Sequence, residues 1–116
     1  MKAEEVVAAL GALAHEHRLA AYRLLVEAGP EGLSAGVIAE RLGLPPSSLT
    51  FHLQALLHAG LVTQRRVSRQ IIYGIVPAAV NGLVAYLTEH CCGGEACAPV
   101  CQPQAATGRG RRTRAA

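Results

Sequence analysis

The chain has 116 residues, 51% of them apolar and only 3% aromatic, so it can form one small domain with a core of Leu, Val, Ile and Ala, but not two domains. Its net charge is +3, yet four of the eleven basic residues are arginines in the last eight positions. Without them seven basic groups face eight acidic ones, a net charge of −1, which excludes a uniformly basic surface. No run of eighteen apolar residues is present, which excludes a membrane-spanning helix of that kind.

The N-terminus and the cysteines indicate a cellular compartment. Residues 1–5 include two glutamates where a secretory signal would have a basic region followed by apolar residues. We therefore expect a cytoplasmic protein. All four cysteines lie between Cys91 and Cys101. In a reducing compartment, clustered cysteines indicate metal or redox chemistry rather than structural disulfides.

Two amphipathic helices are predicted first, over residues 3–13 and 15–28. The first is too short to be stable alone, so we expect it to pack on the domain or on a second subunit. Ser34 is the expected N-cap of a two-turn third helix, which stops before a pair of prolines. A fourth helix is predicted over residues 46–59, with Gly60 as its C-cap.

The third and fourth helices have the pattern of a helix-turn-helix, because a short helix and a tight turn precede a longer helix with small polar residues near its start. A helix that enters the major groove needs such side chains, since Gln can pair with adenine and Ser or Thr can reach bases or phosphates. A solvated helix face is the alternative. The polar side chains predicted to point outward are Ser47, Ser48, Thr50, His52 and Gln54.

Residues 61–67 and 70–76 have strand composition, which predicts a β-hairpin. Arg65, Arg66 and Arg69 form the basic cluster of the folded part at its tip. A basic hairpin after a helix-turn-helix is typical of a wing, whose arginines hold phosphates or enter the minor groove. The alternative is a solvated charged hairpin.

Pro77 suits the first position of a last helix, which we expect to end between His90 and Cys92, before two glycines. Its wide apolar face, together with the first helix, predicts the interface of a two-fold dimer. The predicted organisation is a winged helix-turn-helix and dimerisation domain over residues 1–92, mainly α-helical with about five helices and a two-stranded wing. A cysteine-containing loop and a disordered basic tail follow over residues 93–116.

The chain resembles the ArsR/SmtB family of bacterial metal-responsive winged-helix repressors over residues 4–90. Three segments carry the resemblance: residues 13–19, residues 47–56 followed by 59–62, and Arg65-Arg66 followed by Tyr73. It implies a homodimeric repressor that leaves its double-stranded operator DNA when a metal or metalloid binds. It also implies DNA contacts from the five polar residues of the fourth helix and from the wing arginines.

Two metal sites of the family are missing from this sequence. Residues 37–42 of the third helix contain no cysteine, and the last helix offers only Asn81, Glu89 and His90 where zinc sensors have Asp and His. The cysteine cluster therefore remains. Adjacent helical residues point about 100° apart, so neighbouring thiols converge on one ion only where the helix unwinds.

Three thiolates from one flexible segment suit As(III), and Sb(III) should behave alike. The cluster resembles that of a subgroup whose arsenite site joins a vicinal cysteine pair to a third cysteine beyond the last helix. This implies Cys91, Cys92 and Cys97 as metal ligands, with Cys101 as the substitute third ligand. Open alternatives are a four-cysteine zinc or cadmium site, a methylated arsenical held by two thiols, and a redox-sensing disulfide.

Two other classes of function are alternatives to a repressor. We do not expect an enzyme, because no Ser/His/Asp arrangement or phosphate loop is present, and residues 15–17 (His-Glu-His) lack the spacing of a zinc protease. These residues are expected to be an exposed helix start. A DNA-binding structural protein without an effector would keep its operator affinity in arsenite, antimonite, zinc, cadmium or oxidant.

Overall fold

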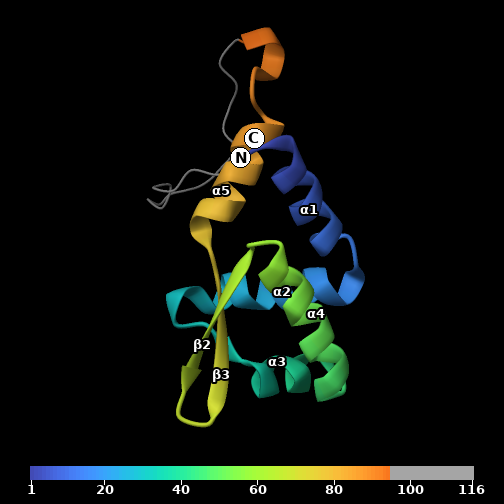
Figure 1. The fold of residues 1–116 in the computed structure, drawn as a ribbon, viewed down its shortest axis with the longest axis vertical. Helices are drawn as coiled ribbons and strands as arrows, with labels where there is room; N and C mark the ends of the chain where they lie inside the picture. The colour runs from blue at the N-terminus through green and yellow to red at the C-terminus, as the bar shows by residue number, and fades with distance from the viewer. Residues whose placement is uncertain (95–116) are drawn as a thin grey trace, which may run out of the picture.

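The computed structural model describes residues 1–94, which form five α-helices, two 3-10 helices and three strands (Figure 1). In chain order these are α1 (Ala3–Leu13), α2 (Glu16–Ala28), η1 (Gly29–Glu31), β1 (Leu33–Ser34), α3 (Ala35–Leu42), α4 (Pro46–His58), β2 (Val62–Val67), β3 (Gln70–Ile75), α5 (Pro77–Leu87) and η2 (Cys91–Gly94). The predicted fold class, a mainly α-helical winged helix-turn-helix, is confirmed. Nowhere in this described part does a helix have the length and apolarity needed to cross a membrane.

The wing is the antiparallel hairpin of β2 and β3, whose last pair before the turn is Val67 and Gln70. The structure adds a strand that was not predicted, β1, which pairs antiparallel with β3 and gives the strand order β1-β3-β2. Two residues are too few to show the alternation that marks a strand in a sequence. Gly32 leads into β1 with a φ of 75°, and a Cβ there would clash with the carbonyl oxygen of Tyr73.

The first four helices begin and end within one residue of their predicted bounds. Ser34 caps α3, because its Oγ accepts a hydrogen bond from the Val37 N–H at 3.2 Å. His15, expected as the first residue of the second helix, is instead the N-cap of α2. α4 begins at Pro46, and Gly60 follows its C-cap, Ala59, in the left-handed conformation, with a φ of 79°.

α5 begins at Pro77, as predicted, but it ends at Leu87 and not between His90 and Cys92. The described side chains of residues 84–93 are exposed, so no packing stabilises another helical turn there. His90 then adopts a φ of 60°, which lies outside the right-handed helical range. The predicted end of this helix was wrong because it was based on the two glycines as the stop signal, whereas the helix ends earlier, where its packing on the core ends.

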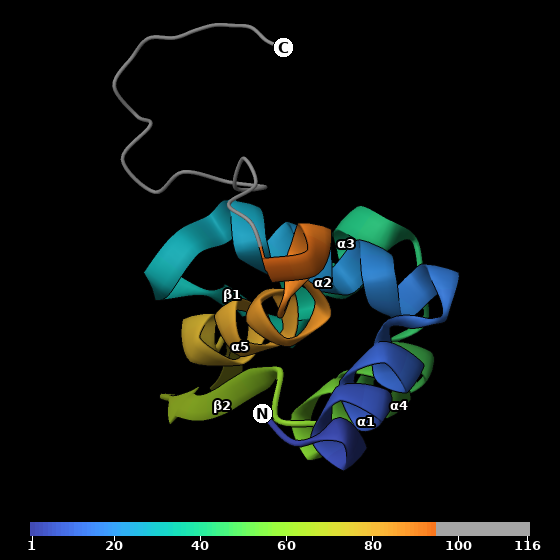
Figure 2. The ribbon, with the colours of Figure 1, turned by 90° about the horizontal axis from the view of Figure 1, so that it is seen from above.

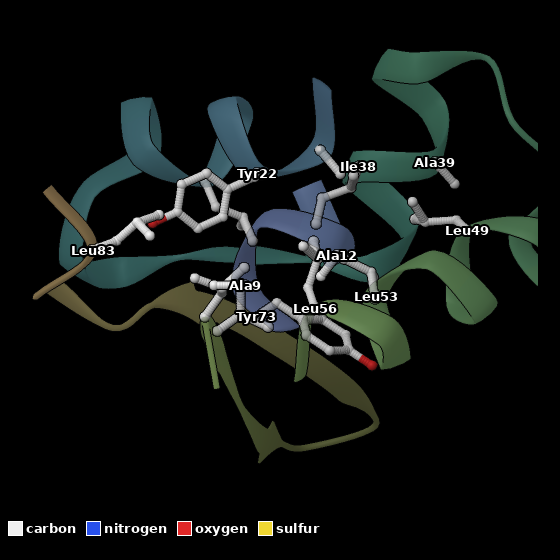
Figure 3. Close-up of a cluster of buried hydrophobic side chains, with 14 of the residues drawn as sticks. Ala9, Ala12, Tyr22, Ile38, Ala39, Leu49, Leu53, Leu56, Tyr73 and Leu83 are labelled. Atoms are coloured by element: carbon white, nitrogen blue, oxygen red, sulfur yellow. The ribbon is translucent and has the colours of Figure 1, made fainter. Parts of the chain in front are cut away.

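The core lies between the helices and the sheet, where side chains from both sides meet (Figure 3). Tyr22 of α2, Tyr73 of β3 and Leu83 of α5 are part of it. The largest fully buried side chains are Leu25, Ile38, Leu49, Leu53, Leu56 and Leu61. Half of these six belong to α4, and each buried leucine contributes about 1.5–3 kcal/mol of transfer free energy. The inward face of α4 is therefore firmly attached to the domain, which leaves its outward face for contacts with other molecules.

The elements separate into two ends along the longest axis of the molecule (Figure 1), and Figure 2 looks down that axis from the end that holds α5 and η2. We call α3, the first half of α4 and the tip of the β2–β3 hairpin the hairpin end. We call α1, α5 and η2 the cysteine end. The large apolar side chains exposed on the helices of the cysteine end are Val7, Leu10, Val84, Tyr86 and Leu87.

Candidate nucleic-acid interface and thiol site

The start of α4 is the first candidate for a DNA contact. Ser47, Ser48 and Thr50 are exposed there, as predicted. Pro45 precedes the helix and provides no side-chain cap, so the N–H groups of the first turn are left for an outside acceptor, an arrangement that favours phosphate. The Thr50 Oγ1 donates to the carbonyl oxygen of Pro46 at 2.9 Å, which fixes this side chain in one orientation.

His52 differs from the other polar residues predicted on this face, because it points inward. Only 9% of it is exposed, and its Nδ1 accepts a hydrogen bond from the Arg18 Nε at 3.3 Å. Burial lowers the pKa of His52, and the positive charges of His15, Arg18 and His17 lower it further. The expectation that His52 points outward is therefore wrong, since it lies three residues after Leu49 and shares the inward side of the helix.

Three histidine rings meet where α2 begins beside α4. The centroid of the His15 ring lies 4.6 Å from that of His52 and 5.5 Å from that of His17, and the centroids of His17 and His52 are 5.6 Å apart. The His15 Nδ1 accepts a hydrogen bond from the His17 N–H at 3.1 Å and so caps α2. Within residues 1–94, no three His, Cys, Asp or Glu side chains are arranged to hold a metal ion. We therefore assign these rings to capping and to the packing of α2 on α4.

Phe51 lies on the outward side of α4, and it is the side chain that sequence reasoning missed. It is 66% exposed. Helical spacing puts it on one stripe with Ser47, four residues earlier, and half-buried Gln54, three residues later. The guanidinium carbon of Arg18 lies 5.8 Å from the centroid of its ring. The signal was available in the sequence, because the spacing places an aromatic residue among polar ones on the side away from the buried leucines.

The three wing arginines have different environments. The Arg65 Nη2 donates to the Glu31 carbonyl oxygen at 2.8 Å and so joins β2 to η1. Arg66 points to the opposite face of the strand, and Arg69 lies in the turn; both are exposed. Ser68 precedes Arg69 with a φ of 59°, which closes the turn without a glycine. All three arginines are exposed, and Arg65 differs from the other two in its hydrogen bond to the backbone of η1.

The four cysteines predicted as metal ligands fall into two groups. Cys91 and Cys92 lie in η2, whereas Cys97 and Cys101 lie outside the described residues. Cys92 has a φ of 58° and a ψ of 36°, so the backbone leaves right-handed helical geometry at this point. The Sγ atoms of Cys91 and Cys92 are 3.6 Å apart. The backbone is therefore unwound at this pair of adjacent cysteines.

Known proteins similar to this chain are regulators of transcription. A helix-turn-helix domain model matches residues 13–65. The HTH-type transcriptional regulator YgaV of Escherichia coli (strain K12) is 34% identical over 90 residues, which cover 78% of this chain and 89% of YgaV. The chain belongs to the ArsR/HlyU-like family of winged-helix transcriptional regulators.

Solved structures of ArsR/HlyU-like regulators share this fold. HlyU from Vibrio cholerae N16961 is 30% identical, with a TM-score of 0.62 over 79% of this chain and 99% of HlyU. The homodimeric winged helix-turn-helix DNA-binding domain of Mb0332 from Mycobacterium bovis, a possible ArsR-family regulator, is 27% identical, with a TM-score of 0.62 over 75% of this chain and 81% of that domain. The match to the helix-turn-helix family includes α2, α3 and α4 but not η2. The cysteine-containing segment after α5 therefore lies outside the residues that match this family.

Proposed function

We propose that this regulator is a cytoplasmic, arsenite-responsive repressor. In this proposal a homodimer binds a palindromic operator, and As(III) or Sb(III) binding to Cys91, Cys92 and a third cysteine releases it. Cys97 is the proposed third ligand, with Cys101 as its substitute. The observation that carries the proposal is the pair of adjacent cysteines, whose sulfurs lie 3.6 Å apart shortly after the last helix.

The sulfur spacing supports a shared soft ion. A tetrahedral ion with metal–sulfur bonds of ~2.3 Å holds its sulfur ligands about 3.8 Å apart, close to the spacing of Cys91 and Cys92. A pyramidal three-coordinate ion such as As(III) needs one more thiolate, whereas tetrahedral zinc or cadmium needs two. Which ion is preferred therefore depends on how many cysteines take part.

The apolar surface of the cysteine end supports a dimer. Val7 and Leu10 of α1 are exposed, as are Val84 and Leu87 of α5. A patch of large apolar side chains on two neighbouring helices indicates a protein-protein contact. A two-fold interface would bury this patch against its own copy, and the Mb0332 domain is homodimeric.

The same layout gives a route from thiols to DNA. η2 follows α5, and α5 belongs to the proposed interface, so a ligand that reshapes the start of η2 acts where the two subunits meet. The two α4 helices must lie about one DNA turn apart to occupy successive major grooves. A change at the interface alters that spacing, and a coupling free energy of ~1–3 kcal/mol would lower operator affinity by about 5–150-fold.

The test is a fluorescence-anisotropy titration of operator-bound protein with arsenite, antimonite, zinc, cadmium, methylarsenite and peroxide. We expect release by arsenite and antimonite at the lowest concentrations. Release by zinc alone, by peroxide alone, or by methylarsenite but not arsenite would replace the proposed inducer with one of those alternatives. No release by any of them would indicate a regulator without a thiol effector.

Matched single variants identify the ligands. Cys91→Ser and Cys92→Ser should abolish the response to arsenite, because they remove the vicinal pair. Cys97→Ser should abolish it as well, and Cys101→Ser should leave it nearly unchanged. If only the Cys101 variant loses the response, the third ligand is Cys101. Operator affinity without arsenite serves as the control and should be equal in all four variants.

A further inference from the structure

We propose that Phe51 is a specificity-determining residue that contacts the 5-methyl group of a thymine in the major groove, and that Arg18 positions its ring. The inference rests on the proposed use of α4 as the DNA-reading helix. It goes further by naming one base, one atom of that base and one side chain.

The exposure of Phe51 is not explained by the proposed subunit interface. It is the single phenylalanine of the chain, and 66% of it is exposed. The exposed apolar residues of α1 and α5 belong to the cysteine end, whereas Phe51 belongs to the first half of α4, which lies at the hairpin end (Figure 1). A single exposed apolar side chain is common on a protein surface, so the neighbours of Phe51 along the helix decide which partner suits it.

Its neighbours along the helix support DNA as that partner. Ser47 and Gln54 share the outward stripe of α4 with Phe51, and both carry hydrogen-bonding groups suited to base edges or phosphates. α4 is the second helix of the helix-turn-helix, which is the helix that enters the major groove in this motif. A protein partner on the same stripe would compete with the operator.

The ring is held from its inner side. The Arg18 guanidinium carbon lies 5.8 Å from the centroid of the Phe51 ring, within the range of a cation–π contact. The His52 ring lies 5.8 Å from the Phe51 ring at an interplanar angle of 67°, an edge-to-face arrangement. Arg18 is itself fixed by its hydrogen bond to His52. These contacts limit the orientations of the ring and leave its outer side for a ligand.

Thymine is the base that suits this side chain. In the major groove thymine presents a methyl group, and an apolar side chain such as Phe can contact it. Cytosine presents an amino group that a phenyl ring cannot pair with, and uracil lacks the methyl group altogether. A methyl group removed from water is worth ~0.8 kcal/mol, which corresponds to about a fourfold change in affinity.

The experiment uses the full-length protein and a duplex that it selects from a random pool. Each thymine of this duplex is replaced by uracil, one position at a time. We expect about fourfold weaker binding at one thymine in each half-site, and about 15-fold weaker binding when the symmetric pair is replaced, since the two losses add in free energy. All other replacements should change affinity by less than twofold.

Variants connect the effect to Phe51. Phe51→Ala should bind the thymine and uracil duplexes equally, whereas Phe51→Leu, which keeps an apolar side chain, should retain part of the discrimination. Arg18→Gln should lower the ratio of the affinity for the thymine duplex to the affinity for the uracil duplex. A general loss of folded protein would not change this ratio. The unfolding temperature of Phe51→Ala should match the wild type, because its side chain is mostly exposed.

The outcomes separate this inference from the proposed function. If the wild type binds its selected duplex but no thymine-to-uracil change weakens it, the assignment of Phe51 is overturned while DNA reading by α4 stands. The same conclusion follows if Phe51→Ala keeps the full discrimination. If no duplex is selected at all, the proposed repressor function fails, and the assignment of Phe51 with it.

Discussion

The hairpin end and the cysteine end of this regulator are built differently. At the hairpin end, polar side chains are already fixed by internal hydrogen bonds: Thr50 to Pro46, Arg65 to Glu31. At the cysteine end, large apolar side chains are exposed, and the backbone leaves helical geometry just after the last helix. The difference indicates that the DNA-reading surface is largely preformed, while the other end is completed by a second subunit and, in our proposal, by a ligand.

The largest effect should come from charging the apolar patch. Val7→Glu places a carboxylate in the proposed subunit interface, because Val7 is 68% exposed on α1. We expect a monomer in sedimentation velocity and a loss of operator affinity greater than about 100-fold, since two linked half-site contacts become separate ones. Val67→Glu, which makes the same change at a 46% exposed position in the hairpin, is the control and should remain dimeric. A dimeric Val7→Glu protein would contradict the assignment of the interface.

The next effect tests whether the hairpin is preformed by its connection to β1. Gly32→Ala should lower the free energy of unfolding by about 2 kcal/mol or more, because a Cβ clashes with the Tyr73 carbonyl and φ is 75°. Gly36→Ala is the matched control within α3, where a Cβ meets no atom within 4 Å. It should stabilise the protein by up to ~1 kcal/mol. Equal unfolding temperatures for the two variants would disprove this role of Gly32.

A smaller effect separates the wing arginines. Arg66→Ala should weaken binding to all sequences and reduce the slope of log affinity against log salt concentration by about 1, because one phosphate contact is lost. Arg65→Ala should change the slope less, since the guanidinium of Arg65 already donates to the carbonyl oxygen of Glu31. The two variants are compared in the same salt titration. If the Arg65 variant changes the slope more than the Arg66 variant, the division of roles in the wing is reversed.

The smallest effect concerns pH. Burial, with His15, Arg18 and His17 nearby, lowers the pKa of His52 in the folded protein below its usual value of 6.5. As pH falls below 6.5, the unfolded chain takes up a proton at His52 before the folded protein does. The free energy of unfolding therefore decreases as the pH falls through this range. Urea titrations between pH 7.5 and about 5 should show that the free energy of unfolding falls more steeply with pH for the wild type than for His52→Asn. Parallel profiles would argue against this contribution.

Apolar spacing and breaker residues were sufficient to predict the helices, the hairpin and the inward leucines of α4, because each depends on local pattern. The errors arose where tertiary contacts decide. His52 is polar in type, yet a hydrogen bond from Arg18 allows it to be buried. The hydrogen bond from Arg65 to a carbonyl 34 positions earlier also depends on the tertiary fold, so the sequence does not show it. The end of α5 depends on where the core ends, and sequence spacing does not show this.

The most direct test of the account compares the full chain with a version that ends at residue 90. The buried core residues of the part that the structure describes lie between Val6 and Leu83, so the shortened protein should fold and bind the operator. Operator-bound samples of both are titrated with arsenite and followed by anisotropy. We predict that the full chain is released and that the shortened protein remains bound at the same arsenite concentrations. Equal release of both would contradict the claim that the cysteine-containing segment from residue 91 onward controls DNA binding.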